Sequence, residues 1–239
     1  MSRSKLLGAA LALPLMFAGA TSAQANIIGL TIDGSGSISA ADFTLQKNGY
    51  IAALTALLNT DGSNAIGVWQ FSSGVQTEFS LQLIDSAAKK TALLNAIGAM
   101  VQLDSTTAIG DSINTAAAAI NAFTGNTCLT TNAGKCLIDV STDGGNNTGS
   151  NPTTAANAAF ATGIRTNCLG VGGSADCSFN NAAGVGIDFI ANNFAAFQAA
   201  ITAKLSAELT PTPEPITLTL FGAGLVGAAA LRRRKSKTA

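Results

Sequence analysis

The feature that most constrains the fold is an apolar segment that ends in a turn rich in glycine and serine. Residues 26–32 (Asn-Ile-Ile-Gly-Leu-Thr-Ile) have the composition of a buried strand, and Asp33-Gly34-Ser35-Gly36-Ser37 follows them directly. One carboxylate and two hydroxyls therefore stand at the carboxyl end of a strand, the edge where an open α/β sheet binds its ligands. Oxygen ligands of this kind select Mg²⁺, Ca²⁺ or Mn²⁺ over softer metals.

Two later segments carry oxygen-bearing side chains in a similar setting. Residues 105–110 (Ser-Thr-Thr-Ala-Ile-Gly) lead into an alanine-rich helical pattern, and Asp143-Gly144 follows a strand predicted at 137–142. Taken alone, the Asp-Gly-Ser-Gly-Ser run also suits an ordinary solvated turn. Three such segments, each at a strand end or a helix start, favour a metal site.

Strand and helix patterns alternate along residues 26–209, which predicts one α/β domain. Further strands are predicted at 65–71, 75–81, 137–142, 164–171 and 185–190, and helices at 39–58, from an Asp85 cap to Val101, and at 107–123, 152–163 and 192–208. The expected sheet is open and mostly parallel, with helices on both faces and one antiparallel edge strand after a hairpin at 72–74. Trp69 is expected in the core, and Asp139 is expected to accept hydrogen bonds from backbone donors or a neighbouring loop.

The charge and the missing histidine exclude several classes of function. The whole chain holds 13 basic and 13 acidic residues and no histidine. Seven of the basic residues lie in residues 1–25 and 216–239, whereas all 13 acidic ones lie in residues 26–215, so this middle part carries a net charge near −7. Such a domain is a poor candidate for binding nucleic acid, because neutralising phosphates takes clustered Lys and Arg. Because the chain has no histidine, it lacks the residue that most often serves as a general base and as a ligand of transition metals.

The four cysteines are expected to form disulfides. Cys128, Cys136, Cys168 and Cys177 allow three pairings, and we favour Cys128–Cys136 and Cys168–Cys177 because each pair brackets a loop rich in Gly or Asn. A zinc site is the alternative, but the chain has neither a Cys-x-x-Cys pair nor a histidine.

Both ends of the chain carry targeting features. Residues 1–25 have a basic start, an apolar run and the small-residue site Ala23-Gln24-Ala25, which is typical of a secretory signal peptide; an uncleaved anchor helix is the alternative. Residues 210–239 comprise a proline-rich linker, an apolar helix predicted at 216–231 and a basic end. An ordinary single-pass anchor is one interpretation of this tail, with its basic end in the cytoplasm.

The tail resembles the PEP-CTERM sorting signal of Gram-negative bacteria, with Pro213, Glu214 and Pro215 as its motif. The resemblance implies that the exported protein is held at the inner membrane until an exosortase-type protease cuts near the motif. The tethered protein would then be released to the cell surface or the extracellular matrix.

The oxygen-bearing segments resemble the metal-ion-dependent adhesion site (MIDAS) of von Willebrand factor type A domains, in a bacterial secreted subfamily of unassigned function. The resemblance implies the Rossmann-like open sheet of that family and one divalent cation, Mg²⁺ first, with Mn²⁺ or Ca²⁺ as alternatives. The implied ligands are Asp33, Ser35, Ser37, Thr107 and Asp143. The serines and the threonine are expected to bind directly and the aspartates through water. Gly34 stands where an aliphatic residue is usual, and we expect a looser loop there.

Three functions follow from these features. The favoured one is a non-catalytic, metal-dependent adhesion module, in which the open position on the cation takes a carboxylate from a partner protein or an acidic polysaccharide. A structural matrix protein with a vestigial metal site is the second. A metal-assisted hydrolase is the third, although no base is positioned beside Ser35 or Ser37 in the sequence.

Overall fold

The structure is a computed structural model that describes residues 24–183 and 186–209. The signal peptide up to residue 23, the sorting motif at 213–215 and the apolar helix expected at 216–231 lie outside the described residues. Within them, no helix is both long enough and apolar enough to cross a membrane.

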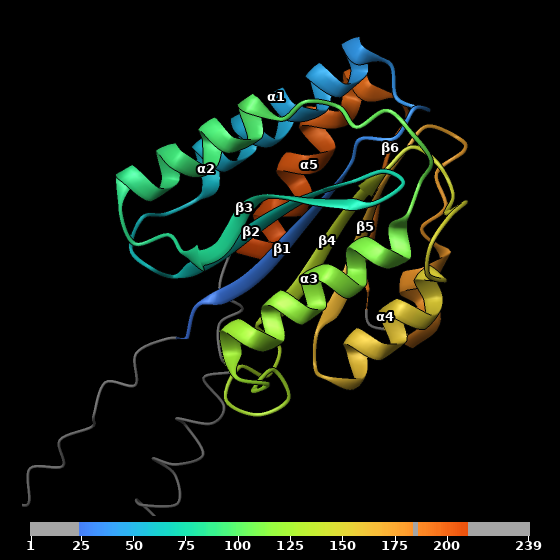
Figure 1. Ribbon diagram of the computed structural model, residues 1–239. Coiled ribbons are helices and arrows are strands. Elements are labelled where there is room, and N and C mark those ends of the chain that lie inside the picture. Colours follow the sequence, from blue (N-terminus) through green and yellow to red (C-terminus); the bar gives the residue numbers. More distant parts are fainter. Residues whose placement is uncertain (1–23, 184–185, 210–239) are drawn as a thin grey trace, which may run out of the picture.

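The described chain folds around one six-stranded sheet, with helices on both of its faces (Figure 1). The strands are β1 (Asn26–Asp33), β2 (Asn64–Phe71), β3 (Val75–Leu83), β4 (Cys136–Thr142), β5 (Arg165–Val171) and β6 (Asp188–Ala191). Their order is β3-β2-β1-β4-β5-β6, and only the β2–β3 pair is antiparallel. The expected sheet, mostly parallel with one antiparallel edge strand, is confirmed.

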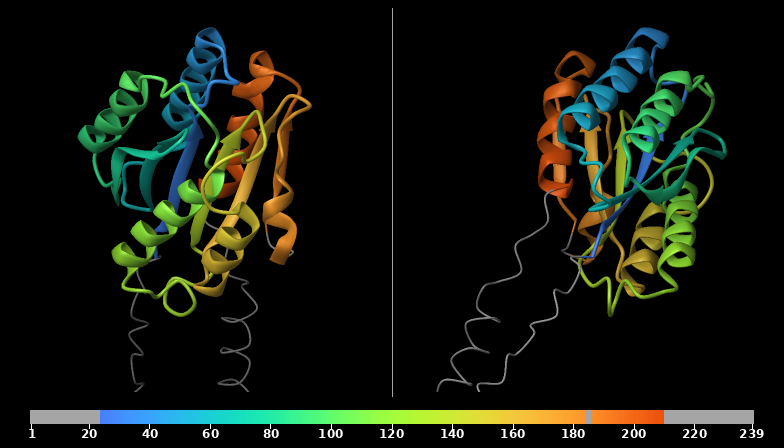
Figure 2. Two further views of the ribbon diagram at one scale, coloured as in Figure 1. Left: turned by 45° about the vertical axis from the view of Figure 1, so that its right-hand side comes forward. Right: turned by 90° about the vertical axis from the view of Figure 1, so that its left-hand side faces the viewer.

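Five α-helices and one short 3₁₀ helix cover this sheet. They are α1 (Ala40–Leu57), α2 (Ala87–Ala99), α3 (Ile109–Thr124), α4 (Pro152–Ala161), η1 (Ser178–Ala183) and α5 (Phe194–Leu209). Helices α1, α2 and α5 pack on one face, and α3 and α4 on the other (Figures 1 and 2). Two apolar clusters fill the spaces between sheet and helices, so the central strands are buried on both faces, as is usual for parallel strands. Trp69 is buried in the cluster on the α3 side, as expected.

The predicted start and end of α2 are wrong by a short distance. Ser86, not Asp85, caps this helix, with its Oγ accepting from Lys89 N at 3.4 Å. Asp85 instead forms an exposed ion pair with the Lys89 ammonium at 2.9 Å. The helix ends at Ala99, and Val101 lies beyond it with 77% of its surface exposed. Beyond the helix, Gln70 of β2 donates to the main-chain carbonyl of Val101 at 3.0 Å and holds this segment beside β2.

The interpretation of Asp139 is also wrong. This residue lies on β4 with its side chain fully buried, and it faces the ammonium of Lys204 on α5 rather than backbone donors or a loop. Asp139 alternates with Ile138 and Val140, which belong to the α3-side cluster, so it points to the opposite face, where α1 and α5 pack.

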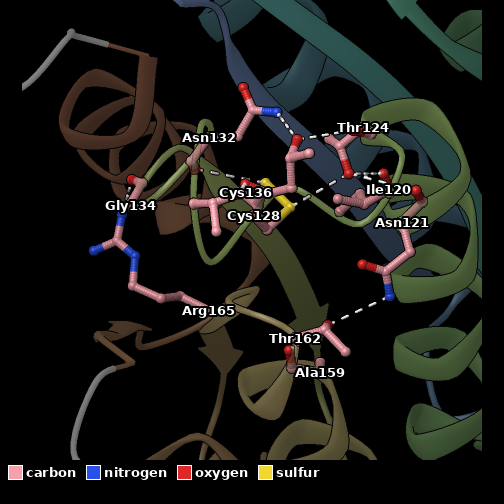
Figure 3. Close-up of a disulfide and its surroundings, with 12 residues drawn as sticks. Ile120, Asn121, Thr124, Cys128, Asn132, Gly134, Cys136, Ala159, Thr162 and Arg165 are labelled. Atoms are coloured by element: carbon pink, nitrogen blue, oxygen red, sulfur yellow. Dashed lines mark hydrogen bonds between the residues drawn. A yellow bond between two sulfur atoms is a disulfide. The ribbon is translucent and has the colours of Figure 1, made fainter.

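Both favoured disulfides are present, Cys128–Cys136 and Cys168–Cys177, and the described residues hold no free cysteine. Figure 3 shows the first, which closes the loop between α3 and β4. Next to it, Asn132 donates to Thr127 Oγ1 at 2.7 Å, and Thr124 Oγ1 lies 3.7 Å from Cys128 Sγ.

Replacing Cys128 and Cys136 together by serine is expected to lower the free energy of unfolding by about 2.5 kcal/mol, because the unfolded chain regains the entropy of that loop. Urea unfolding of the oxidised chain and of the double variant measures the difference. Equal midpoints would contradict the expectation.

Candidate metal centre

The first loop of the site is built around the carboxylate of Asp33. This residue is fully buried at the end of β1, and its Oδ1 accepts a hydrogen bond from Ser35 N at 2.8 Å. Its Oδ2 accepts a second one from Thr142 Oγ1 at 2.6 Å, at the end of neighbouring β4. Gln46 of α1 donates to the main-chain carbonyl of Asp33 at 2.7 Å. These contacts fix the start of the turn between β1, β4 and α1.

The hydroxyls of the turn connect it to the loop that follows β4. Ser35 Oγ lies 3.1 Å from Ser37 Oγ, and Ser37 Oγ donates to Asp143 Oδ1 at 2.5 Å. Ser35 is buried and Ser37 is exposed, so this chain of oxygens leads from the core to the surface. Four of the five predicted ligands therefore lie in one hydrogen-bonded cluster at the carboxyl edge of the sheet: Asp33, Ser35, Ser37 and Asp143.

The segment of Thr107, the fifth predicted ligand, reaches the same loops through its main chain. Gly36 N donates to Ser105 O at 2.8 Å, which joins this segment to the turn. Thr107 is buried just before α3, where its N–H donates to Asn147 Oδ1 at 2.8 Å and its carbonyl accepts from Asn147 N at 3.0 Å. The structure thus places Thr107 in a segment bound to both other loops, and the side chain of Asn147 holds it there.

The space beside Gly34 is filled, so the expectation of a looser loop is wrong. A Cβ at Gly34 would collide with the side chain of Gln70, which lies against it from β2. Gln70 Oε1 accepts from Leu103 N at 3.0 Å, and its Nε2 donates to Val101 O at 3.0 Å. Because Gly34 has no side chain, the amide of Gln70 fits beside it and bonds to the segment before Thr107.

Three further polar residues support the loops, and their role was not predicted from the sequence. Ser72 Oγ, at the end of β2, accepts from Ser105 N at 2.9 Å and donates to Thr106 O at 3.0 Å. Gln102 Nε2 donates to Ser35 O at 3.0 Å and Ile38 O at 2.7 Å, and Asn146 Oδ1 accepts from Gly110 N at 3.2 Å. Their position in the sequence could have indicated this role for Ser72 and Asn146, because each of them follows a strand at the same edge of the sheet.

Both carboxyl groups of the cluster resist ionisation. Burial raises the pKa of Asp33 from 3.8 to about 6, although hydrogen bonds from Ser35 and Thr142 lower it in part. The pKa of Asp143 is also raised, first by burial and then by the charge of Asp42, against a hydrogen bond from Ser37. The surrounding groups therefore stabilise the carboxylates of Asp33 and Asp143 only in part. A divalent cation between the loops would favour these carboxylates over the protonated acids.

The metal-free chain is expected to lose stability as the pH rises from about 4 to about 6, by about 3 kcal/mol from Asp33 alone. The sign follows because the pKa of Asp33 is higher in the folded chain than in the unfolded one, so the folded chain binds the proton more tightly in this range. Urea unfolding in EDTA across the range measures it, with Asp33→Asn as the comparison. A variant with the same pH dependence as the wild type would refute the assignment.

The donor set suits a hard divalent cation. It offers two carboxylates and three hydroxyls, whereas the chain has no imidazole and its four thiols are bound in disulfides. In residues 24–183 and 186–209, no group of three or more Cys, Asp or Glu side chains has the arrangement of a metal site. A cation at this cluster therefore needs hydroxyl and water ligands, which Mg²⁺ accepts because it usually keeps several waters.

Comparison with solved structures gives the fold class. The chain is similar to the von Willebrand factor type A structure from Catenulispora acidiphila, with a TM-score of 0.62 and 16% identity over 78% of this chain and 43% of that one. It is similar to proximal thread matrix protein 1 from the mussel byssus, solved with a zinc-occupied MIDAS motif, with a TM-score of 0.60 and 23% identity over 78% of this chain and 48% of that one. BatB from Bacteroides thetaiotaomicron matches with a TM-score of 0.55 and 21% identity, over 76% of this chain and 97% of BatB.

At these identities the likeness shows a von Willebrand factor type A fold and nothing more. The chain spans about half the length of the mussel protein that it matches. No curated protein matches it. Two family models do: a PEP-CTERM protein-sorting motif over residues 211–235, and over residues 26–213 the family described as "Protein of unknown function (DUF1194)". This chain therefore belongs to the DUF1194 family, with a domain of von Willebrand factor type A fold followed by a PEP-CTERM sorting motif.

Proposed function

We propose that this protein is an exported, non-catalytic binding module that uses one divalent cation to bind a carboxylate of a partner. The cation would lie between the loops after β1 and β4 and the segment before α3. Ser35, Ser37 and Thr107 would bind it directly, and Asp33 and Asp143 through water. When bound, it would supply a positive charge with an open position for an acidic group.

One observation supports this proposal above the others: the hydrogen-bonded line from Asp33 through Ser35 and Ser37 to Asp143. These four side chains come from segments more than 100 residues apart, yet Ser37 Oγ contacts Asp143 Oδ1 at 2.5 Å. The raised pKa values of both carboxyl groups add to it, since such groups gain most from a nearby cation. A zinc-occupied MIDAS motif in the mussel protein agrees with a divalent ion in this fold.

The two ends of the domain suit a tethered binding protein. Asn26, at the start of β1, donates to the carbonyl of Leu209, at the end of α5, at 3.3 Å. The candidate metal centre lies at the other end of β1. A membrane tether through the tail, cut by an exosortase-type protease, would leave the metal centre facing away from the inner membrane until release to the cell surface or matrix.

A structural role in an extracellular matrix is the second candidate, because one similar structure is a matrix protein of the mussel byssus. In that case the cation would only hold the three loops together, or would not bind at all. The two functions differ in one property: only the adhesion module needs its cation in order to retain a partner.

The test is capture of partners by the full chain, immobilised and exposed to the envelope and exopolysaccharide fraction of the bacterium that encodes it. We expect material to be retained in Mg²⁺ and released by EDTA. Retention should also fall when the carboxylates of the fraction are methyl-esterified, because the cation would then meet no charged group.

The matched controls are a chain with Ser35 and Ser37 replaced by alanine and a chain with Ser80→Ala, which changes an exposed serine of β3. The first should retain nothing above background and the second should behave as the wild type. Equal retention in Mg²⁺ and EDTA, or by the double variant, would overturn the proposed function.

A further inference from the structure

A group of three ionisable side chains is buried between β4 and α5, outside the candidate metal centre and on the opposite side of the sheet from α3. Lys204 and Asp139 have fully buried side chains, and the side chain of Glu208 is only 3% exposed. Lys204 Nζ is in contact with Asp139 Oδ1 and lies 3.2 Å from Glu208 Oε1. The spacing of Lys204 and Glu208, one helical turn apart on α5, points both of them at β4.

The surroundings of these groups are mostly apolar. Tyr50 and Phe197 pack against each other beside the group, with ring centroids 5.6 Å apart, in the cluster that also holds Ile201 and Leu205. The charge of Asp139 is near enough to Tyr50 to help burial raise the pKa of that phenol. Little in this region can stabilise a separated charge.

The ionised groups are poorly paired for their depth. Apart from the contacts of the three groups with one another, no hydrogen-bond partner within the described part of the chain reaches Asp139 Oδ1, Asp139 Oδ2, Lys204 Nζ or Glu208 Oε2. Asn167 Nδ2 donates to Glu208 Oε1 at 2.7 Å. A buried carboxylate usually accepts several hydrogen bonds, and a buried ammonium donates as many as three. With ion contacts alone, these groups therefore form fewer hydrogen bonds than the carboxylates can accept and the ammonium can donate.

We propose that Lys204 and Asp139 are joined by an intramolecular amide bond that forms once the chain has folded. The folded chain holds the amine and the carboxyl group in contact, in a site from which bulk water is excluded. Condensation replaces two buried charges by one neutral amide, which removes the unfavourable burial of both ions. The high effective concentration of the two groups favours the reaction.

The reaction balances without an oxidant or a cofactor. The Lys204 ammonium first passes a proton to the Asp139 carboxylate, which gives an amine and a carboxylic acid. The nitrogen lone pair then forms a bond to Asp139 Cγ, and the bond from Cγ to one carboxyl oxygen breaks. That oxygen leaves as water with the proton it received and a further proton, while Nζ keeps one hydrogen in the amide.

Glu208 is placed to move the second proton. Burial, followed by the charge of Asp139, raises the pKa of its carboxyl group to about 8, which favours the protonated form. It donates this proton to the departing oxygen and recovers one from Nζ, so it ends unchanged. A pocket of about 50 Å³ lined by Asn26, Leu137, Asn167 and Glu208 gives the water a way out.

The bond would join the middle of the sheet to the last helix before the tail. Residues 210–239 follow α5 directly, so a pull on a tethered chain would otherwise act first on the packing of that helix. A covalent link from Lys204 to β4 would carry such a pull into the central strands, next to the loop that holds Asp143.

Peptide mapping of the full chain tests the proposal. Trypsin cuts after Lys135 and Arg165, which releases residues 136–165 as a unit that contains Asp139. After reduction and alkylation, we expect this unit to remain attached to the peptide that contains Lys204, with a total mass lower by one water. Trypsin should also fail to cut after Lys204. A free 136–165 peptide at the mass of its sequence, with cleavage after Lys204, would show an ion pair only and would overturn the proposal.

Three variants of the full chain sharpen the test. Lys204→Arg should release the free 136–165 peptide, whereas Lys89→Arg, a change at an exposed ion pair with Asp85, should keep the linked one. Glu208→Gln should slow the reaction and leave a larger unlinked fraction at a fixed time after synthesis. A linked fraction in Glu208→Gln equal to that of the wild type at every time would remove Glu208 from the mechanism. The result on the wild-type chain decides the bond itself, even if a variant fails to fold.

Discussion

Replacing Ser35 and Ser37 together by alanine is expected to abolish Mg²⁺ binding, with a loss in affinity of more than about 100-fold. The two hydroxyls lie between the carboxylates of Asp33 and Asp143, and alanine leaves no oxygen there to bind a cation. The chain should remain folded, because the hydrogen bond from Ser35 N to Asp33 uses the main chain and survives the change. Isothermal titration calorimetry with MgCl₂ measures the loss.

The cost in stability should be small but measurable. Ser35 is buried, so its alanine variant loses a partly buried hydrogen bond to Ser37 and is expected to be less stable by about 1 kcal/mol. Ser80→Ala serves again as the control, since this exposed residue lies on β3. An unchanged Mg²⁺ affinity in the double variant would count against the site, and a chain that unfolds would call for the single Ser37→Ala variant, in which only an exposed hydroxyl is removed.

Lys204→Met is expected to lower the free energy of unfolding by about 3–5 kcal/mol, the effect of removing one partner from a buried ion pair. The carboxylate of Asp139 would then lie in the core without its cation. The free energy of unfolding should fall whether Lys204 is joined to Asp139 by an amide bond or only by an ion pair. Urea unfolding at pH 7 measures the change.

Two further chains separate the causes of this effect. Lys204→Met combined with Asp139→Leu removes the stranded carboxylate and should recover part of the lost stability. Lys89→Met breaks only the exposed pair with Asp85 and should change stability by less than about 1 kcal/mol. A Lys204→Met chain as stable as Lys89→Met would show that the buried group does not contribute to folding.

The sequence predicted the fold class because the local patterns agree with the tertiary structure. The apolar run of β1 is nearly continuous, as a strand buried on both faces requires, and Ser39 caps α1 where the helical pattern starts. The pairs Cys128–Cys136 and Cys168–Cys177 were predictable for a similar reason, since each closes a short loop.

Apart from the meeting of the loops around Asp33, Thr107 and Asp143, the sequence did not predict contacts that join distant segments. Nothing near Lys204 indicates that it faces Asp139, 65 residues earlier, because that contact depends on how α5 packs on the sheet. The residues that support the candidate metal centre were missed for the same reason. Gln70 fills the space beside Gly34 and Asn147 holds Thr107 only after β2, α3 and β4 have come together.

The most direct test of the candidate metal centre is to locate a bound ion in a crystal of the chain soaked in MnCl₂. Mn²⁺ takes the same oxygen ligands as Mg²⁺, and its anomalous scattering identifies it. We predict one anomalous peak within bonding distance of Ser35 Oγ and Ser37 Oγ, on the side of Thr107 and Asp143. A fully soaked crystal with no peak between these loops, or with Mn²⁺ bound only elsewhere, would contradict the account of this protein as a metal-dependent binding module.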